Sequence, residues 1–136
     1  MDLLRIVYAS QPFGFDDAML NGILSDARYH NARHGVTGAL ICRADIYLQL
    51  LEGPEAAIKD TYARIAIDNR HLDVGLMIEE PAAERMFADW AMLDDPARSW
   101  MWTQKEVAAG ALSRADRAEI LGVFKRLQTE ANAARA

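Results

Sequence analysis

The sequence is short of cysteine and of clustered positive charge. Its single cysteine, Cys42, cannot form a disulfide within the chain, and the apolar residues around it indicate a buried thiol in a reducing compartment. Fifteen Lys and Arg residues stand against twenty Asp and Glu residues, the net charge is −5, and the basic residues are scattered. An acidic protein repels phosphate backbones, so we expect no nucleic-acid binding.

Long apolar runs are also missing. No stretch approaches the ~18 consecutive apolar residues that a membrane-spanning helix requires. The segment from Met1 to Arg5 lacks the basic and apolar regions of a signal peptide. We therefore expect a cytoplasmic protein that does not bind membranes. The length of 136 residues and the hydrophobic fraction of 51% fit one ordinary globular domain.

The motifs of several enzyme classes are absent as well. The sequence has no glycine-rich phosphate loop, no paired-cysteine motif and no His-Glu-x-x-His metal site. His30 and His34 are spaced to share one helix face, but no third ligand is evident nearby, so we expect two partly exposed histidines. An acylphosphatase-type enzyme needs an arginine loop after the first strand, and residues 10–15 contain no arginine. We expect no enzymatic activity.

The order of apolar patterns and turn residues predicts an α+β protein. Period-two runs predict strands, and apolar residues three or four apart predict helices. We expect helices that begin near Asp16 and after Gly53. The predicted strands are Leu3–Ala9, Val36–Cys42, Ile46–Glu52, Leu72–Glu79 and Met86–Leu93. This βαββαββ order matches a ferredoxin-like sheet with two helices on one face.

A further helix is predicted near the C-terminus. Its apolar positions recur at helical spacing and are Ile120, Leu121, Phe124, Leu127 and Ala131. Val7, Leu48 and Leu50 point to the sheet face away from the first two helices and would form an apolar patch if left bare. We therefore expect a domain at residues 1–95 and a helical extension at 96–136. The extension's helix is expected to pack on that other face, in the same chain or in a partner subunit.

Three polar side chains are predicted on the inner side of the sheet domain. Tyr8 has the parity of the inward positions of the first strand, Gln49 lies between Tyr47 and Leu51, and Asn31 shares the inner face of the first helix. Buried without partners, such groups are costly. Either they hydrogen-bond with one another or water, or they hold a polar heterocycle between the helices. Spacing alone leaves both explanations open.

These three residues lie in blocks of sequence that resemble the BLUF family of photoreceptors. The blocks follow the order and spacing of the family over residues 3–93, and G-V-T-G-A-L together with Q-x-L-E-G is specific to it. The matching blocks are Val7–Ser10, Asn31–Leu40, Tyr47–Gly53, Asp68–His71 and Phe87–Met92. The chain is most similar to short, single-domain members.

The resemblance implies roles for these side chains. Tyr8 would be the photoactive tyrosine, which gives an electron and a proton to an excited flavin. Gln49 would lie between that phenol and the N5/O4 edge of the flavin, and Asn31 would hydrogen-bond to the pyrimidine part of the ring. Further flavin-binding residues implied by the resemblance are Ile23, His30, Leu51, Arg70 and His71.

The resemblance also implies a function. The chain would be a blue-light photoreceptor with FAD as its cofactor, or with FMN or riboflavin in its place. Excitation would rearrange the hydrogen bonds of Gln49, and Trp90 and Met92 of the last strand would pass the signal through the C-terminal helix to an effector protein. We expect a homo-oligomer, in the simplest case a dimer. The alternative is a flavin-free domain of the same fold that binds another small ligand and regulates a partner.

Overall fold

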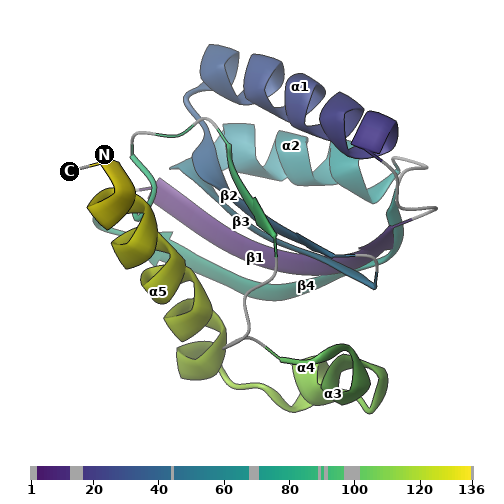
Figure 1. Ribbon diagram of the computed structural model, residues 1–136. Coiled ribbons are helices and arrows are strands. Elements are labelled where there is room, and N and C mark those ends of the chain that lie inside the picture. Colours follow the sequence, from purple (N-terminus) through teal and green to yellow (C-terminus); the bar gives the residue numbers. More distant parts are fainter. Residues whose placement is uncertain are drawn as a thin grey trace. The chain divides into compact units, whose positions relative to one another are not determined.

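Figure 1 shows a computed structural model of the chain. The structure describes residues 3–12, 17–43, 45–67, 71–88, 90, 92–96 and 102–135. The chain divides into two compact units, Met1–Pro96 and Ala97–Ala136. Each unit is described by itself below.

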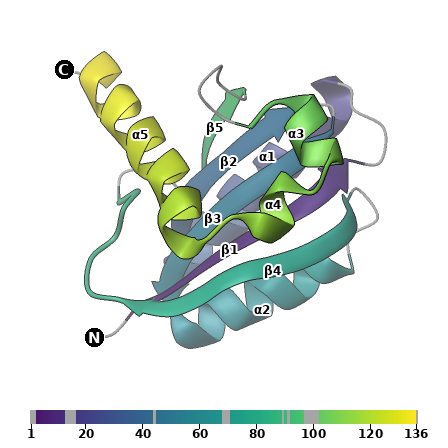
Figure 2. The same ribbon diagram turned by 90° about the horizontal axis from the view of Figure 1, so that it is seen from below.

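The first unit is a five-stranded sheet with helices on one face. The strands are β1 (Leu3–Pro12), β2 (Thr37–Arg43), β3 (Ile46–Pro54), β4 (His71–Ala82) and β5 (Leu93–Pro96). Their order is β4-β1-β3-β2-β5, which can be followed in Figure 2. β5 runs parallel to β2 and the other pairs are antiparallel. Helices α1 (Asp17–His34) and α2 (Glu55–Ala66) lie on the same face in Figure 1. The predicted ferredoxin-like α+β fold is confirmed.

The two-residue period of the central strands separates two buried faces. Tyr8 is paired with Gln49 across β1 and β3, and Val7 is paired with Leu50. The face toward α1 and α2 contributes Ile6, Tyr8, Tyr47 and Leu51 to a core that also includes Ile58 of α2. On the opposite face Val7, Leu48 and Leu50 are also fully buried. Because side chains alternate between the faces, a one-residue slip of β1 would turn Tyr8 away from the helices, and a slip of β3 would do the same to Gln49.

Local backbone chemistry sets the ends of the helices. Gly35 ends α1 at a φ of 71°, in the left-handed region that glycine enters without strain. The amide of Val36 then donates to the carbonyl of Asn31 at 3.0 Å. Pro54 precedes the first residue of α2 and has an extended backbone, so its lack of an N–H costs no helical hydrogen bond. Both helices therefore begin close to where the sequence predicts.

The last strand was predicted wrongly at Met86–Leu93. Residues 83–88 form bends and a turn, Trp90 and Met92 lie outside the ladder, and β5 begins only at Leu93. The cause is a set of hydrogen bonds that takes the place of strand pairing. The amide of Phe87 donates to the carboxylate of Glu52 at 2.6 Å, and the amide of Trp90 donates to the carbonyl of Phe87 at 3.2 Å. Other strands extend two or three residues beyond the prediction, as β4 does to Ala82.

The second unit consists of helices α3 (Gln104–Ala108), α4 (Ala111–Arg114) and α5 (Arg117–Arg135). Capping boxes start two of them. Thr103 and Glu106 exchange side-chain-to-backbone hydrogen bonds at α3, and Asp116 and Glu119 do so at α5. The predicted C-terminal helix is α5, whose buried residues are Ile120, Leu121, Phe124 and Leu127. In the described part of the chain, no helix is long and apolar enough to cross a membrane.

Candidate functional site

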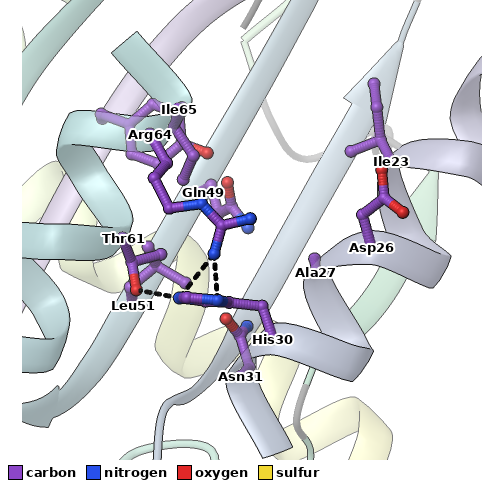
Figure 3. A pocket seen from close by; sticks show the side chains of 11 residues that line it. Ile23, Asp26, Ala27, His30, Asn31, Gln49, Leu51, Thr61, Arg64 and Ile65 are labelled. Carbon is purple, nitrogen blue, oxygen red and sulfur yellow. Dashed lines mark hydrogen bonds between the residues drawn. The ribbon is translucent and has the colours of Figure 1, made fainter. Parts of the chain in front are cut away.

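A cleft lies between α1 and α2, over the inner face of the sheet. Its volume is about 110 Å³. The floor comes from β1 and β3, one wall from α1 and the other from α2, as Figure 3 shows for the labelled side chains. The lining residues are Tyr8, Ile23, Asp26, Ala27, His30, Asn31, Gln49, Leu51, Thr61, Arg64 and Ile65.

The floor places a phenol next to an amide. Tyr8 and Gln49 are directly opposite each other on neighbouring strands, and both side chains point toward the helices. Side chains in such a pair have Cβ atoms about 5 Å apart. Both residues are buried, with 0% of Tyr8 and 4% of Gln49 exposed. The ring of Tyr62, on α2, meets the ring of Tyr8 edge-on at 5.8 Å between centroids. Tyr8 is thus held tightly while its hydroxyl end shares the cleft with Gln49.

Gln49 also contacts the segment that leads into β5. Its Nε2 donates a hydrogen bond to the sulfur of Met92 at 3.3 Å. Met92 is buried, whereas Trp90 is half-buried and packs edge-on against Phe87. Of the two residues predicted to pass the signal, Met92 is therefore the one that hydrogen-bonds to the amide of Gln49 in this structure.

Asn31 and the apolar side chains of α1 form one wall. Asn31 is only 1% exposed although its side chain is polar. Ala27 and Ile23 lie one and two turns before it on the same helix face, and the cleft runs along all three. The wall therefore offers apolar contacts from Ile23 and Ala27 and an amide from Asn31, and Asp26 and His30 add polar groups to it.

The mouth of the cleft is bridged by a polar chain from α1 to α2. The hydroxyl of Thr61 donates to the carbonyl of Ala57 at 2.7 Å, so it accepts the hydrogen bond from His30 Nε2 at 3.0 Å. His30 is then the neutral tautomer with its proton on Nε2, and its Nδ1 accepts from the guanidinium of Arg64. Figure 3 shows these three side chains meeting. The ring of His34 lies 4.3 Å from that of His30, but no group of three metal-binding side chains occurs among the described residues.

The side chains of the cleft fit a flavin. An isoalloxazine ring is flat, largely apolar at one end, and rich in hydrogen-bonding atoms at its pyrimidine end. The cleft supplies apolar contacts from Ile23, Leu51 and Ile65, and hydrogen-bonding groups from Asn31 and Gln49. Its volume is below the ~300–1,000 Å³ of typical small-molecule sites. Arg64 and His30 meet across the mouth of the cleft. We therefore expect this pair to separate when an isoalloxazine ring enters.

Comparison with known families shows to which family the chain belongs. The profile described as "BLUF: Sensors of blue-light using FAD" matches residues 3–93. The chain belongs to the BLUF family. It is a blue-light photoreceptor, and its cofactor is a flavin.

Individual BLUF proteins resemble the chain over different lengths. The photoactivated adenylate cyclase subunit beta of Euglena gracilis is 34% identical over 91 residues, which are 66% of this chain and 10% of that protein. The blue light- and temperature-regulated antirepressor BluF of Escherichia coli is 34% identical over 70 residues, 52% of this chain and 17% of that protein. The dark-state structure of BlrB, a BLUF protein, has a TM-score of 0.78 and 25% identity, and the match covers 95% of this chain and 97% of that one.

The structure brings together most of the residues that the sequence assigned to the BLUF flavin site. Six of the eight line the cleft, namely Tyr8, Ile23, His30, Asn31, Gln49 and Leu51. Arg70 lies outside the described residues, and His71 is described only as the first residue of β4. Whether the six contact flavin stays a prediction. Met92, predicted to carry the signal, contacts Gln49 directly.

The second wall was missed by reasoning from sequence. Thr61, Arg64 and Ile65 on α2, like Asp26 and Ala27 on α1, line the cleft but were not assigned to the site, although Ala27 and Ile65 have the spacing of inward positions. A signal for them exists in the helical spacing. Thr61 and Ile65 follow Ile58 at three and seven residues, so they share its inward face. Spacing did not show that α2 faces α1 across a cleft. Arg64 can therefore be recognised as a lining residue only from the structure.

His30 gives the mouth of the cleft a pH dependence. Burial lowers its pKa below the ordinary value of 6.5, Arg64 and His34 lower it further, and Asp60 opposes them. The unfolded chain then binds the proton more tightly than the folded one. The contribution of neutral His30 is therefore complete above pH 6.5, and is lost as the pH falls toward the lowered pKa.

We expect His30→Gln to reduce the loss of stability on acidification. Gln keeps a donor and an acceptor for Thr61 and Arg64 but does not titrate in this range. Urea unfolding of both proteins at about pH 7.5 and about pH 5.5 measures the difference. The wild type should lose more stability than the variant over this interval. Equal losses would contradict the assignment of a lowered pKa to His30.

Proposed function

We propose that light is sensed by Tyr8 and Gln49 in the cleft between α1 and α2. The observation that supports this most directly is their pairing on adjacent strands, with both side chains buried in the cleft. A bound flavin supplies the absorption of blue light and an excited state that accepts an electron. The remaining steps belong to side chains of the chain itself.

Tyr8 is proposed to give up one electron and its phenolic proton. A phenol is a good electron donor only if its proton has somewhere to go, and the neighbouring amide of Gln49 has both an acceptor oxygen and donor N–H groups. When the charges recombine, the electron and the proton return to Tyr8, so no net oxidation occurs. Gln49 is left rotated or tautomerised, and it presents a different hydrogen bond to the flavin carbonyl.

The contact with Met92 is proposed to report this rearrangement. Gln49 Nε2 donates to the sulfur of Met92 at 3.3 Å in this structure, which we take as the arrangement in the dark. Once the amide is rearranged, this N–H no longer faces the sulfur, and the segment that carries Trp90 and Met92 loses one of its contacts. A change in hydrogen bonding of ~1 kcal/mol is enough to bias an element that has two arrangements of similar energy.

The output is proposed to be binding of another protein rather than catalysis. BlrB matches this chain over nearly its whole length, while the matched segment is 10% of the Euglena cyclase subunit. The Escherichia coli relative is named an antirepressor, which agrees with an effector protein as target. We also propose that α5 covers the sheet face of Val7, Leu48 and Leu50, in the same chain or in a second copy of a homo-oligomer. The single cysteine, Cys42, cannot form a disulfide within the chain, which supports a location in the cytoplasm.

The absorption spectrum of the purified chain in the dark and after a blue pulse tests this function. We expect flavin bands that move slightly to longer wavelength and relax back in the dark. Flavin bands that bleach or stay unchanged would overturn the proposed roles of Tyr8 and Gln49. A chain that binds no flavin when it is supplied in excess would contradict the function as a whole.

A further inference from the structure

The segment from Phe87 to Met92, which leads into β5, is held by main-chain hydrogen bonds at Phe87, Trp90 and Met92. At its start, the amide of Phe87 donates to the buried carboxylate of Glu52. In its middle, the carbonyl of Trp90 accepts from the amide of Gly38 on β2 at 3.1 Å. At its end, the carbonyl of Met92 accepts from Nε of Arg28 at 3.2 Å. The first two contacts tie the segment to the sheet, and the third ties it to α1.

Arg28 connects two parts of the site that are distant in sequence. It lies on α1, and its helix neighbours Ala27, His30 and Asn31 line the cleft. Met92 is held by its carbonyl from α1 and by its sulfur from Gln49. A guanidinium is a charge-assisted donor and forms the stronger of these two bonds, because a thioether sulfur is a weak acceptor. The position of the sulfur beside Gln49 therefore depends on the main-chain bond from Arg28.

We propose that Arg28 is a positioning residue of the photocycle, which holds Met92 so that its sulfur meets the amide of Gln49. This inference rests on the proposed roles of Tyr8 and Gln49. After illumination the sulfur loses its N–H partner, but Arg28 keeps the main chain of Met92 in place. The sulfur then remains where only the original orientation of Gln49 can donate to it, which favours return to the dark state. Without Arg28 the main chain of Met92 can move away from Gln49. The light-induced state is then less strained and returns to the dark state more slowly.

The expected result is slower dark recovery in Arg28→Ala. Loss of a charge-assisted hydrogen bond at a partly exposed site should slow dark recovery roughly fivefold. Arg28→Lys keeps one charged donor and should recover within about twofold of the wild type. The matched control is Arg33→Ala, which removes an exposed arginine of α1 that donates to the hydroxyl of the exposed Tyr29. This control should recover at the rate of the wild type.

A double-mutant cycle separates positioning from a general effect on folding. Met92→Leu keeps the volume of the side chain but removes the sulfur acceptor. If Arg28 acts by placing that sulfur, Arg28→Ala should slow recovery by less than about twofold in the Met92→Leu background. An equal slowing in both backgrounds, no slowing in either, or the same slowing in Arg33→Ala would overturn the proposal.

A measurement in the dark distinguishes failure of this inference from failure of the proposed photochemistry. The chain has six methionines, and Met92→Leu identifies the signal of Met92 in a spectrum of carbon-13 methyl-labelled methionine. Arg28→Ala should shift that signal, and Arg33→Ala should not. A wild type without a red shift would contradict the roles of Tyr8 and Gln49 but leave this result valid. An unmoved Met92 signal in Arg28→Ala would reject the positioning role even if the photocycle is normal.

Discussion

Tyr8→Phe is expected to bind flavin as the wild type does and to show no light-induced red shift. The phenyl ring fills the same space and keeps its edge contact with Tyr62, so the fold should lose only about 1 kcal/mol from one hydroxyl group. The excited flavin, however, loses the donor of both the electron and the proton. Difference spectra after a blue pulse measure the effect, and the amplitude of the shift should fall to baseline.

Two further variants make this result specific. Gln49→Leu keeps the size of the side chain but removes the amide that relays the proton, so it should also abolish the shift. Tyr62→Phe is the matched control, since this tyrosine touches the ring of Tyr8 but is not part of the cleft lining. It should retain a red shift of near normal amplitude. An intact photocycle in Tyr8→Phe would contradict the proposed mechanism.

The central strands and their two faces could be predicted from the sequence because the period of a strand is two. Once β1 and β3 were recognised, parity alone placed Tyr8 and Gln49 on one face and Val7 and Leu50 on the other. Asn31 followed by the same reasoning from the helical period. Sequence reasoning therefore found the floor of the site and one wall, because the period of each strand or helix determines on which face its own side chains lie.

The other wall and the last strand depend on contacts between distant segments. Arg64 lines the cleft because α2 packs opposite α1, and nothing in its own neighbourhood indicates this. The predicted strand at Met86–Leu93 has suitable residues, but the carboxylate of Glu52 takes the amide of Phe87 and Arg85 donates to the carbonyl of Gly35. Hydrogen bonds across 35 and 50 residues thus override a local strand preference.

Glu52 and Gln49 show how one strand can hold a segment that is distant in sequence. Both are on β3, and each binds one end of the segment from Phe87 to Met92. Glu52 is fully buried and also accepts from the guanidinium of Arg5 at 3.2 Å, which compensates its charge. One end of the segment is therefore fixed by an ion pair, while the other is held by an amide that light can rearrange. The light-induced loss of a contact is therefore expected at the side chain of Met92, whose main chain Arg28 holds.

Gly38→Ala is expected to destabilise the sheet domain strongly. A Cβ atom at this position would lie 2.0 Å from the carbonyl oxygen of Leu50, a main-chain atom of the neighbouring strand. No rotation of a side chain relieves such a clash, so β2 and β3 must separate locally. The amide of Gly38 also holds the carbonyl of Trp90, so the same displacement disturbs the segment leading to Met92.

The expected cost of Gly38→Ala is about 3 kcal/mol, at the upper end for overpacking of a buried site. Melting followed by circular dichroism should show a midpoint lower by roughly 10 °C. Gly122→Ala is the matched control. This glycine is exposed in the interior of α5, and a Cβ atom there meets nothing within 4 Å. Its replacement should leave the midpoint unchanged or raise it, because alanine favours helix by up to ~1 kcal/mol. Equal midpoints for the wild type and Gly38→Ala would show that β2 and β3 adjust without strain, and that the close approach at Gly38 does not constrain the fold.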